Sequence, residues 1–379
     1  MIWAAWWAAQ AREREEAGLV RTLRPRPADD PTTDLAGNDY LGLSRDPRVV
    51  EAAAAAARTW GVGAGASRLV TGTLAVHAEL EAELAAWTGQ PAALVCSTGY
   101  HANLALVTAL ADPSTFVVSD AHVHASLIDA VRLARARVAV VPHGDVDAVR
   151  RALATHADQA PGGRALVLVE SVYSVLGDAA PLVALADVAA AYGALLVVDE
   201  AHGLGVHGPG LVAAAGLGGQ PHVVLTATLS KALGAQGGAV LGPVALVEHL
   251  VNRARPFIFD TGLAPTSTAG ALAALRVARD EPWHADRVRA RMAALAAALG
   301  VPPAAGAVLS VPMPSPHAAL AAQADLRERG VRVGCFRPPS VPDGVARLRV
   351  TASAGVADAA WDQALAELAR VVGAAREAA

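Results

Sequence analysis

Short apolar runs separated by helical patterns constrain the fold of this chain more than any other feature. Each run is rich in leucine or β-branched residues and is too uniformly apolar for a sheet with one face in water. The alternation predicts an α/β fold with a mostly parallel seven-stranded sheet and helices on both faces. The runs are Ala92–Cys96, Phe116–Ser119, Val138–Val141, Ala165–Val169, Leu195–Val198, Val223–Thr226 and Ala239–Leu241, and helical patterns include His77–Trp87, Leu127–Ala134, Val146–Ala154 and Leu182–Tyr192.

The pattern divides the chain into three regions. Residues 1–36 are expected to form an N-terminal helical arm, with an amphipathic helix ending near Arg24 and a polar connector after it. Residues 37–270 carry the strand–helix alternation and form the expected large domain. Residues 271–379 begin with a long Ala/Arg helix, continue with strand-like pieces and end in a helix from Asp358, which predicts a smaller C-terminal α/β domain. The strand-like pieces are Ala307–Val311, Val331–Gly334 and Ala346–Val350.

Composition narrows the class of protein. The 379 residues carry a formal net charge of −4, which argues against nucleic acid as a partner. The two cysteines, Cys96 and Cys335, form no metal-binding spacing and suggest a reducing compartment without a metal site. The start of the chain lacks the basic region and cleavage site of a signal peptide, and no stretch is long and apolar enough for a bilayer. We therefore expect a cytoplasmic protein without membrane contact.

Lysine is almost absent from the sequence. Of the 31 basic residues, 30 are arginine, and Lys231 is the one lysine. Arginine replaces lysine in most surface ion pairs, but a guanidinium stays protonated and cannot form an imine. Chance in an arginine-rich chain is the plain explanation, and a required primary amine is the alternative.

Polar residues follow several apolar runs at the edge where ligands bind to parallel sheets. Asp199 ends one run, Lys231 follows another, and a Ser97–Tyr100 turn opens a helix after a third. This set suits pyridoxal 5'-phosphate (PLP): the amine binds the aldehyde, the carboxylate holds the pyridine nitrogen protonated, and N–H groups at the helix start bind phosphate. Each residue alone could be a cap or an ordinary turn, so the prediction depends on their coincidence.

Several motifs then resemble one enzyme family, the α-oxoamine synthases. The chain from Asn38 to about Ala354 is similar to these fold-type-I PLP enzymes, which condense an amino acid with an acyl-CoA. The motifs are Asn38-Asp-Tyr-Leu-Gly-Leu, the glycine-rich segment Gly61–Arg68 with Gly72-Thr73, Ser97-x-Gly-Tyr100-x-Ala-Asn103, His124-Ala-Ser126, Asp199-Glu-Ala-His202-Gly, Thr228-Leu-Ser-Lys231 and Arg347-Leu-Arg349-Val-Thr351.

The resemblance implies a role for each matching residue. Lys231, His124, Asp199 and His202 would be catalytic, with His124 stacked on the pyridine ring and Asp199 on its nitrogen. Gly99, Tyr100 and Thr228 would bind the phosphate, and Ser174 and His202 would lie near the phenolic oxygen. Thr261 would reach the phosphate from a second subunit, which implies a homodimer. Arg349 would hold the amino-acid carboxylate, Asn38 would lie near substrate, and Arg21 would meet a distal acyl carboxylate.

Within the family, two segments favour one branch. Arg255–Pro265 and Arg337–Pro342, with the short N-terminal arm, are similar to the branch that joins L-alanine to pimeloyl-CoA, or to pimeloyl-acyl carrier protein, in biotin biosynthesis. The alternatives are glycine C-acetyltransferase, an aminotransferase of the same fold type, and a relative without cofactor. The chain departs from the family at Val123, Ala66 and Leu176, of which Leu176 lies in the Ser174 loop.

Overall fold

The computed structural model describes residues 1–17, 19–338, 341 and 343–377, and the chain forms two compact units, Met1–Thr32 and Thr33–Ala379. The first unit contains helix α1 (Ile2–Glu16), which buries none of its residues. The expected amphipathic helix ending near Arg24 is therefore wrong: α1 ends earlier, and its tryptophans are exposed. The sequence after Glu16 gives the reason, because glycine and β-branched residues are poor helix formers.

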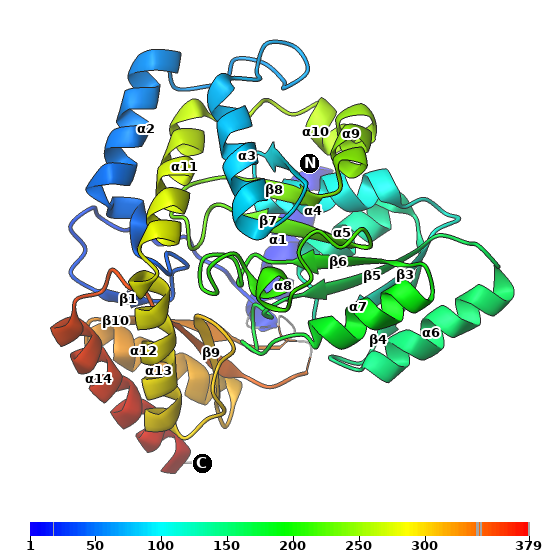
Figure 1. Cartoon of the computed structure of the whole chain (residues 1–379). Coiled ribbons are helices and arrows are strands. Elements are labelled where there is room, and N and C mark those ends of the chain that lie inside the picture. The colour runs from blue at the N-terminus through cyan, green and yellow to red at the C-terminus, as the bar shows by residue number, and fades with distance from the viewer. Residues whose placement is uncertain (18, 339–340, 342, 378–379) are drawn as a thin grey trace. The chain divides into compact units, whose positions relative to one another are not determined.

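A seven-stranded sheet forms the centre of the second unit and confirms the predicted architecture (Figure 1). Its strand order is β2-β8-β7-β6-β5-β3-β4, and β8 alone runs antiparallel to its neighbours. Every predicted apolar run is one of these strands. They are β2 (Ala92–Cys96), β3 (Phe116–Asp120), β4 (Arg137–Val141), β5 (Ala165–Glu170), β6 (Leu195–Asp199), β7 (Val223–Thr228) and β8 (Gly238–Gly242).

Helices cover both faces of this sheet, as the uniformly apolar strands require. In six of the strands, alternate residues enter two separate cores: Val198 of β6 packs in one and Val197 in the other. The edge strand β4 differs, because Val138 and Val140 are exposed, so the expected burial on both faces is wrong for this strand. One face is covered by α3 (Ala75–Thr88), α6 (Val146–Gln159) and α7 (Leu182–Ala191), and the other by α4 (Gly99–Leu110), α5 (Ala125–Ala134), α9 (Val244–Arg253) and α10 (Arg255–Ile258). The short helix α8 (Leu211–Ala214) precedes β7. Helix α11 (Pro265–Asp280) packs on α3 and on α2 (Pro47–Trp60), and α2 follows the 3-10 turn η1 (Leu43–Arg45).

A second sheet of four strands has the order β1-β10-β11-β9. Its strands are β1 (Thr33–Leu35), β9 (Val308–Pro312), β10 (Val331–Phe336) and β11 (Arg347–Thr351), and α12 (Trp283–Leu299), α13 (Pro316–Glu328) and α14 (Asp358–Glu377) pack around it (Figure 1). The assignment of residues 33–36 to the arm is corrected here, because β1 pairs in parallel with β10. The expected domain boundary at residue 271 falls inside α11 and stays a prediction.

Contacts between the two sheets' segments bring residues that are distant in the sequence close together at two places. The segment after β1 is held against the end of β11, since Thr351 Oγ1 donates to the Gly37 carbonyl and the Ala354 N–H donates to the Tyr40 carbonyl. The loop after β5 approaches β9 so closely that a Cβ at Gly177 would lie 2.1 Å from the Val308 carbonyl oxygen. In the described residues, no helix has the length and apolar character needed to cross a membrane.

Candidate active site

A cavity of about 240 Å³ lies at the carboxyl ends of β5, β6 and β7. This is the edge where parallel sheets bind ligands. It brings together seven of the predicted site residues, from four different segments of the chain. Its lining comprises Thr98, Gly99, Tyr100, Asn103, His124, Ser126, Glu170, Asp199, Ala201, His202, Thr228, Ser230 and Lys231.

Lys231 lies in the turn after β7, with its amine inside the cavity. Its Nζ is 2.8 Å from His202 Nε2. Burial lowers the pKa of Lys231 to about 8, although the Asp199 and Glu170 carboxylates oppose this shift. An amine with a pKa near neutrality is available both as a nucleophile and as a base.

A directed hydrogen-bond chain connects this amine with Arg349. Tyr40 Oη donates its one proton to Asn38 Oδ1 at 3.0 Å, so it accepts from His202 Nδ1–H at 2.8 Å. Burial, and then the charge of Lys231, hold the pKa of His202 well below its usual value. Neutral His202 therefore carries its proton on Nδ1 and accepts from Lys231 at Nε2.

The Arg349 guanidinium binds the far end of the same chain. Arg349 lies on β11, is 7% exposed, and donates from Nη2 to Asn38 Oδ1 at 3.3 Å. Its Nε donates to the Ser174 carbonyl at 2.7 Å. The structure thus places Asn38, Ser174 and Arg349 together beside the cavity. Arg347, two residues earlier on the strand, is bound instead by Asp343.

Asp199 ends β6 and is 5% exposed. Its Oδ2 accepts from Asn103 Nδ2 at 2.8 Å, and its Oδ1 accepts from the Ala201 N–H at 2.9 Å. The Asn103 amide in turn is fixed by Thr226, which donates to its Oδ1 at 2.7 Å. Asn103 belongs to one of the sequence motifs, but the sequence analysis gave it no role. It lies one turn after Gly99 on the same face of α4, and this spacing indicates that it points toward the same site.

His124 is the N-cap residue of α5. Its Nδ1 accepts from the Ser126 N–H at 3.2 Å and lies 2.7 Å from Ser126 Oγ. The ring is open to solvent at the cavity, yet the surrounding protein desolvates it enough to lower its pKa. Neutral His124 therefore carries its proton on Nε2.

The start of α4 forms a close-fitting turn against β7. A Cβ at Gly99 would lie 2.9 Å from the Thr228 Cβ, so only glycine fits without displacing that strand. Thr98 caps the helix by accepting from the His101 N–H, which leaves the first N–H groups of α4 facing the cavity edge. Tyr100 Oη donates to Asp129 at 2.6 Å.

Glu170 is a site residue that the sequence reasoning missed. It ends β5 directly beside Asp199, its strand partner, and is 2% exposed. Burial, and then repulsion from Asp199, raise the pKa of Glu170 to about 8. The rule that identified Asp199, a carboxylate directly after an apolar run, would have found Glu170 too.

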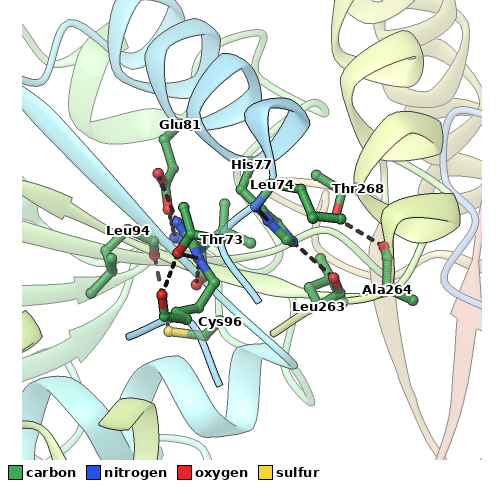
Figure 2. Close-up of polar contacts among 11 residues, drawn as sticks. Thr73, Leu74, His77, Glu81, Leu94, Cys96, Leu263, Ala264 and Thr268 are labelled. Atoms are coloured by element: carbon green, nitrogen blue, oxygen red, sulfur yellow. Dashed lines mark hydrogen bonds and ion pairs between the residues drawn. The ribbon is translucent and has the colours of Figure 1, made fainter. Parts of the chain in front are cut away.

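Thr261 does not line this cavity. Thr261 is exposed on the loop between α10 and α11, where it bridges to Ser67 of the glycine-rich segment. His77 holds the base of this loop: its Nδ1 accepts from the Leu74 N–H at 3.0 Å and its Nε2 lies 2.8 Å from the Leu263 carbonyl oxygen (Figure 2). Arg21 lies in the first compact unit.

The three departures from the family pattern leave the cavity intact. Val123 is buried in the core that α4 and α5 cover. The Ala66 carbonyl accepts from the Gly262 N–H at 3.0 Å. Leu176 is half-buried in the loop after β5.

The residues present fit PLP. A partly desolvated amine and a buried carboxylate face one cavity, and a glycine-opened helix start offers N–H donors for a phosphate. When bound, PLP supplies an electron sink for the electron pair released at a substrate Cα.

Known proteins agree with this assignment. The profile of the aminotransferase class I and II family matches residues 30–368. An 8-amino-7-oxononanoate synthase of Mycolicibacterium gilvum is 54% identical over 358 residues, covering 93% of each chain. The chain belongs to the 8-amino-7-oxononanoate synthase family. It is a PLP-dependent acyltransferase, which decides against the aminotransferase and cofactor-free alternatives.

Solved structures of two related enzymes share the fold. A serine palmitoyltransferase from S. paucimobilis with a bound PLP-myriocin aldimine has a TM-score of 0.87 and 28% identity, covering 98% of each chain. An 8-amino-7-oxononanoate synthase from Francisella tularensis has a TM-score of 0.75 and 25% identity, covering 91% of this chain and 99% of that one. The expected fold-type-I architecture is confirmed.

Proposed function

We propose that this enzyme condenses L-alanine with pimeloyl-CoA, or with pimeloyl-acyl carrier protein, to 8-amino-7-oxononanoate with loss of CO2, a step of biotin biosynthesis. The observation that carries the proposal is the hydrogen-bond chain from Lys231 through His202, Tyr40 and Asn38 to Arg349. It connects an amine that can work on the substrate Cα with a guanidinium that can bind the substrate carboxylate. An α-amino acid carries both groups that this arrangement would recognise, a Cα proton and a carboxylate.

The predicted site residues then have defined tasks. Asp199, oriented by Asn103, keeps a proton on the pyridine nitrogen. The N–H groups of Gly99 and Tyr100, with the Thr228 hydroxyl, bind the phosphate. By the family motifs, His124 would stack on the ring, and Ser174 and His202 would lie near the phenolic oxygen.

Lys231 is the base in this proposal. In the chain without cofactor, burial lowers the pKa of Lys231 to about 8, which favours the neutral amine that a base requires. The neutral amine removes the Cα proton of alanine while Arg349, with Asn38 beside it, holds the carboxylate.

Two further residues, Thr261 and Arg21, are included in the proposed site on the basis of the family motifs. Thr261 is exposed on its own loop, and we infer that it completes the phosphate site of a second subunit in a homodimer. Arg21 is proposed to bind the distal carboxylate of the pimeloyl chain. The proposed acyl donor carries the pimeloyl group as a thioester, either on CoA or on acyl carrier protein.

The test is product mass after incubation of holoenzyme with alanine, glycine or serine and a panel of acyl-CoAs, together with release of free thiol. Alanine with pimeloyl-CoA is expected to be the best pair. A preference for glycine with acetyl-CoA would instead identify a glycine C-acetyltransferase. The Lys231→Ala variant is the control, because borohydride should fix cofactor to the Lys231 peptide of the wild type and to no peptide of the variant.

A further inference from the structure

His143 lies outside the cavity, among the carboxyl ends of three neighbouring strands. It follows β4, while Asp120 ends β3 and Asp178 lies in the loop after β5. His143 Nδ1 is 2.9 Å from Asp120 Oδ1, and its Nε2 is 2.8 Å from Asp178 Oδ2. The imidazole thus bridges two carboxylates.

This geometry fixes the protonation of the ring. Ionised carboxylates only accept hydrogen bonds, so both ring nitrogens of His143 must donate, and the ring is an imidazolium. Asp120 also accepts from the N–H groups of His122 and Gly144, at 2.7 and 2.8 Å, which holds it ionised. Burial opposes the charge on His143, but the two carboxylates outweigh it and raise its pKa to about 9.

Two aromatic rings enclose His143. His122 stacks on it at 4.2 Å between centroids, and the edge of Tyr173 packs against it at 4.3 Å. Burial, and then the charge of His143, lower the pKa of His122, so that ring is neutral; Asp343 is the other acidic group near it. Asp120 and Asp178 are therefore the charged partners of the imidazolium.

Tyr173 and Asp178 are the two ends of the turn that contains Ser174. The Tyr173 N–H donates to the Asp178 carbonyl, and the Gly177 N–H donates to the Tyr173 carbonyl, both at 2.9 Å. Within this turn the Ser174 carbonyl accepts from Arg349 Nε at 2.7 Å. A shift of the turn would therefore move the guanidinium.

We propose that His143 is a positioning residue, which as an imidazolium fixes the Ser174 turn and so orients Arg349 toward the amino-acid carboxylate. This inference rests on the proposed function of Arg349. His143 touches neither cofactor nor substrate in this role, so its effect falls on alanine binding and not on the acyl donor.

The first experiment separates the two substrates in the holoenzyme. His143→Gln, which is neutral, should raise the alanine KM about tenfold through a lost charge-assisted bond and leave the pimeloyl-CoA KM within twofold. The ratio of alanine KM between variant and wild type should fall toward one as pH rises past about 9, because wild-type His143 then loses its proton too. This ratio cancels the titration of alanine itself.

Two further variants, His249→Gln and Arg349→Ala, show which inference fails if His143→Gln leaves the alanine KM unchanged. His249→Gln changes an exposed histidine that contacts the Ala109 carbonyl, and it should leave both KM values unchanged. If Arg349→Ala raises the alanine KM and His143→Gln does not, this inference is overturned while the proposed function stands. If Arg349→Ala has no effect either, the proposed function fails first.

The second experiment does not depend on turnover. In holoenzyme with 15N-labelled histidine, the His143 signals, assigned by their loss in His143→Gln, should show both ring nitrogens protonated at pH 7.5. Asp178→Asn should lower the pH at which they titrate, because one carboxylate is removed. A single-protonated His143 ring at pH 7.5 would overturn the proposal.

Discussion

Replacement of Arg349 tests the amino-acid site most directly. A guanidinium carries five N–H donors, of which the contacts to Ser174 and Asn38 use two, and Tyr40 is a further hydrogen-bond partner. Among the described contacts, the remaining donors are available to a carboxylate in a bidentate arrangement. Because Arg349 is 7% exposed, such a pair would be largely desolvated.

The expected magnitude follows from this burial. A buried charge pair with one partner removed costs about 2–5 kcal/mol, and 1.4 kcal/mol corresponds to a factor of ten. Arg349→Ala should therefore raise the alanine KM by about 30-fold or more. Arg349→Lys keeps a charge but not the planar fork, so it should recover only part of the affinity.

The assay is initial-rate thiol release with alanine and pimeloyl-CoA varied separately. The matched control is Arg347→Lys on the same strand, since Arg347 is engaged by Asp343 and should leave the alanine KM unchanged. Thermal unfolding of each variant excludes a general loss of fold. An equal rise of both KM values, or no rise for alanine, would refute the carboxylate-binding role of Arg349.

Four other changes have defined outcomes. Asp199→Asn should retain cofactor but lose most turnover, because an amide cannot hold the pyridinium proton; normal α-proton exchange with solvent would contradict this. Arg21→Ala should weaken pimeloyl-CoA and leave an acyl-CoA of equal length without the distal carboxylate unchanged, as KM values will show. Gly177→Ala should lower the free energy of unfolding by about 1–3 kcal/mol, since φ is +78° and the added Cβ would meet the Val308 carbonyl oxygen. An unchanged midpoint of urea unfolding would refute this expectation. His143 has a raised pKa in the folded state, so its stabilisation is complete below its ordinary pKa of 6.5 and is lost as pH rises through about 9; urea unfolding should show wild type and His143→Gln converging above that pH.

The strands and the ligand-binding edge were predictable because they depend on local pattern. Uniformly apolar runs predicted burial on both faces, and parallel strands bring their ends, and hence Asp199 and Lys231, to one edge. The reversed direction of β8 was not predicted. It follows β7 after a turn over residues 229–237 with no helix, and so short a connection cannot make a parallel crossover.

Contacts between remote segments were beyond the local pattern. Nothing near Asn38 in the sequence indicates that it meets Arg349, and only the family resemblance placed both near substrate. The pairing of β1 with β10 and the bridge from His143 to Asp178 likewise depend on packing of distant elements. The roles of Thr261 and Arg21 stay predictions.

The joining of residues 37–40 to residues 351–354 has a consequence for synthesis of the chain. The Ala354 N–H binds the Tyr40 carbonyl, and Thr351 binds the Gly37 carbonyl, across a separation of 314 residues. Contacts of such high contact order form late, because the loop they close is long. At roughly 5–20 residues per second, Ala354 leaves the ribosome on the order of ten seconds after Lys231. The nascent chain therefore carries Lys231 for some time before its amino-acid pocket can close.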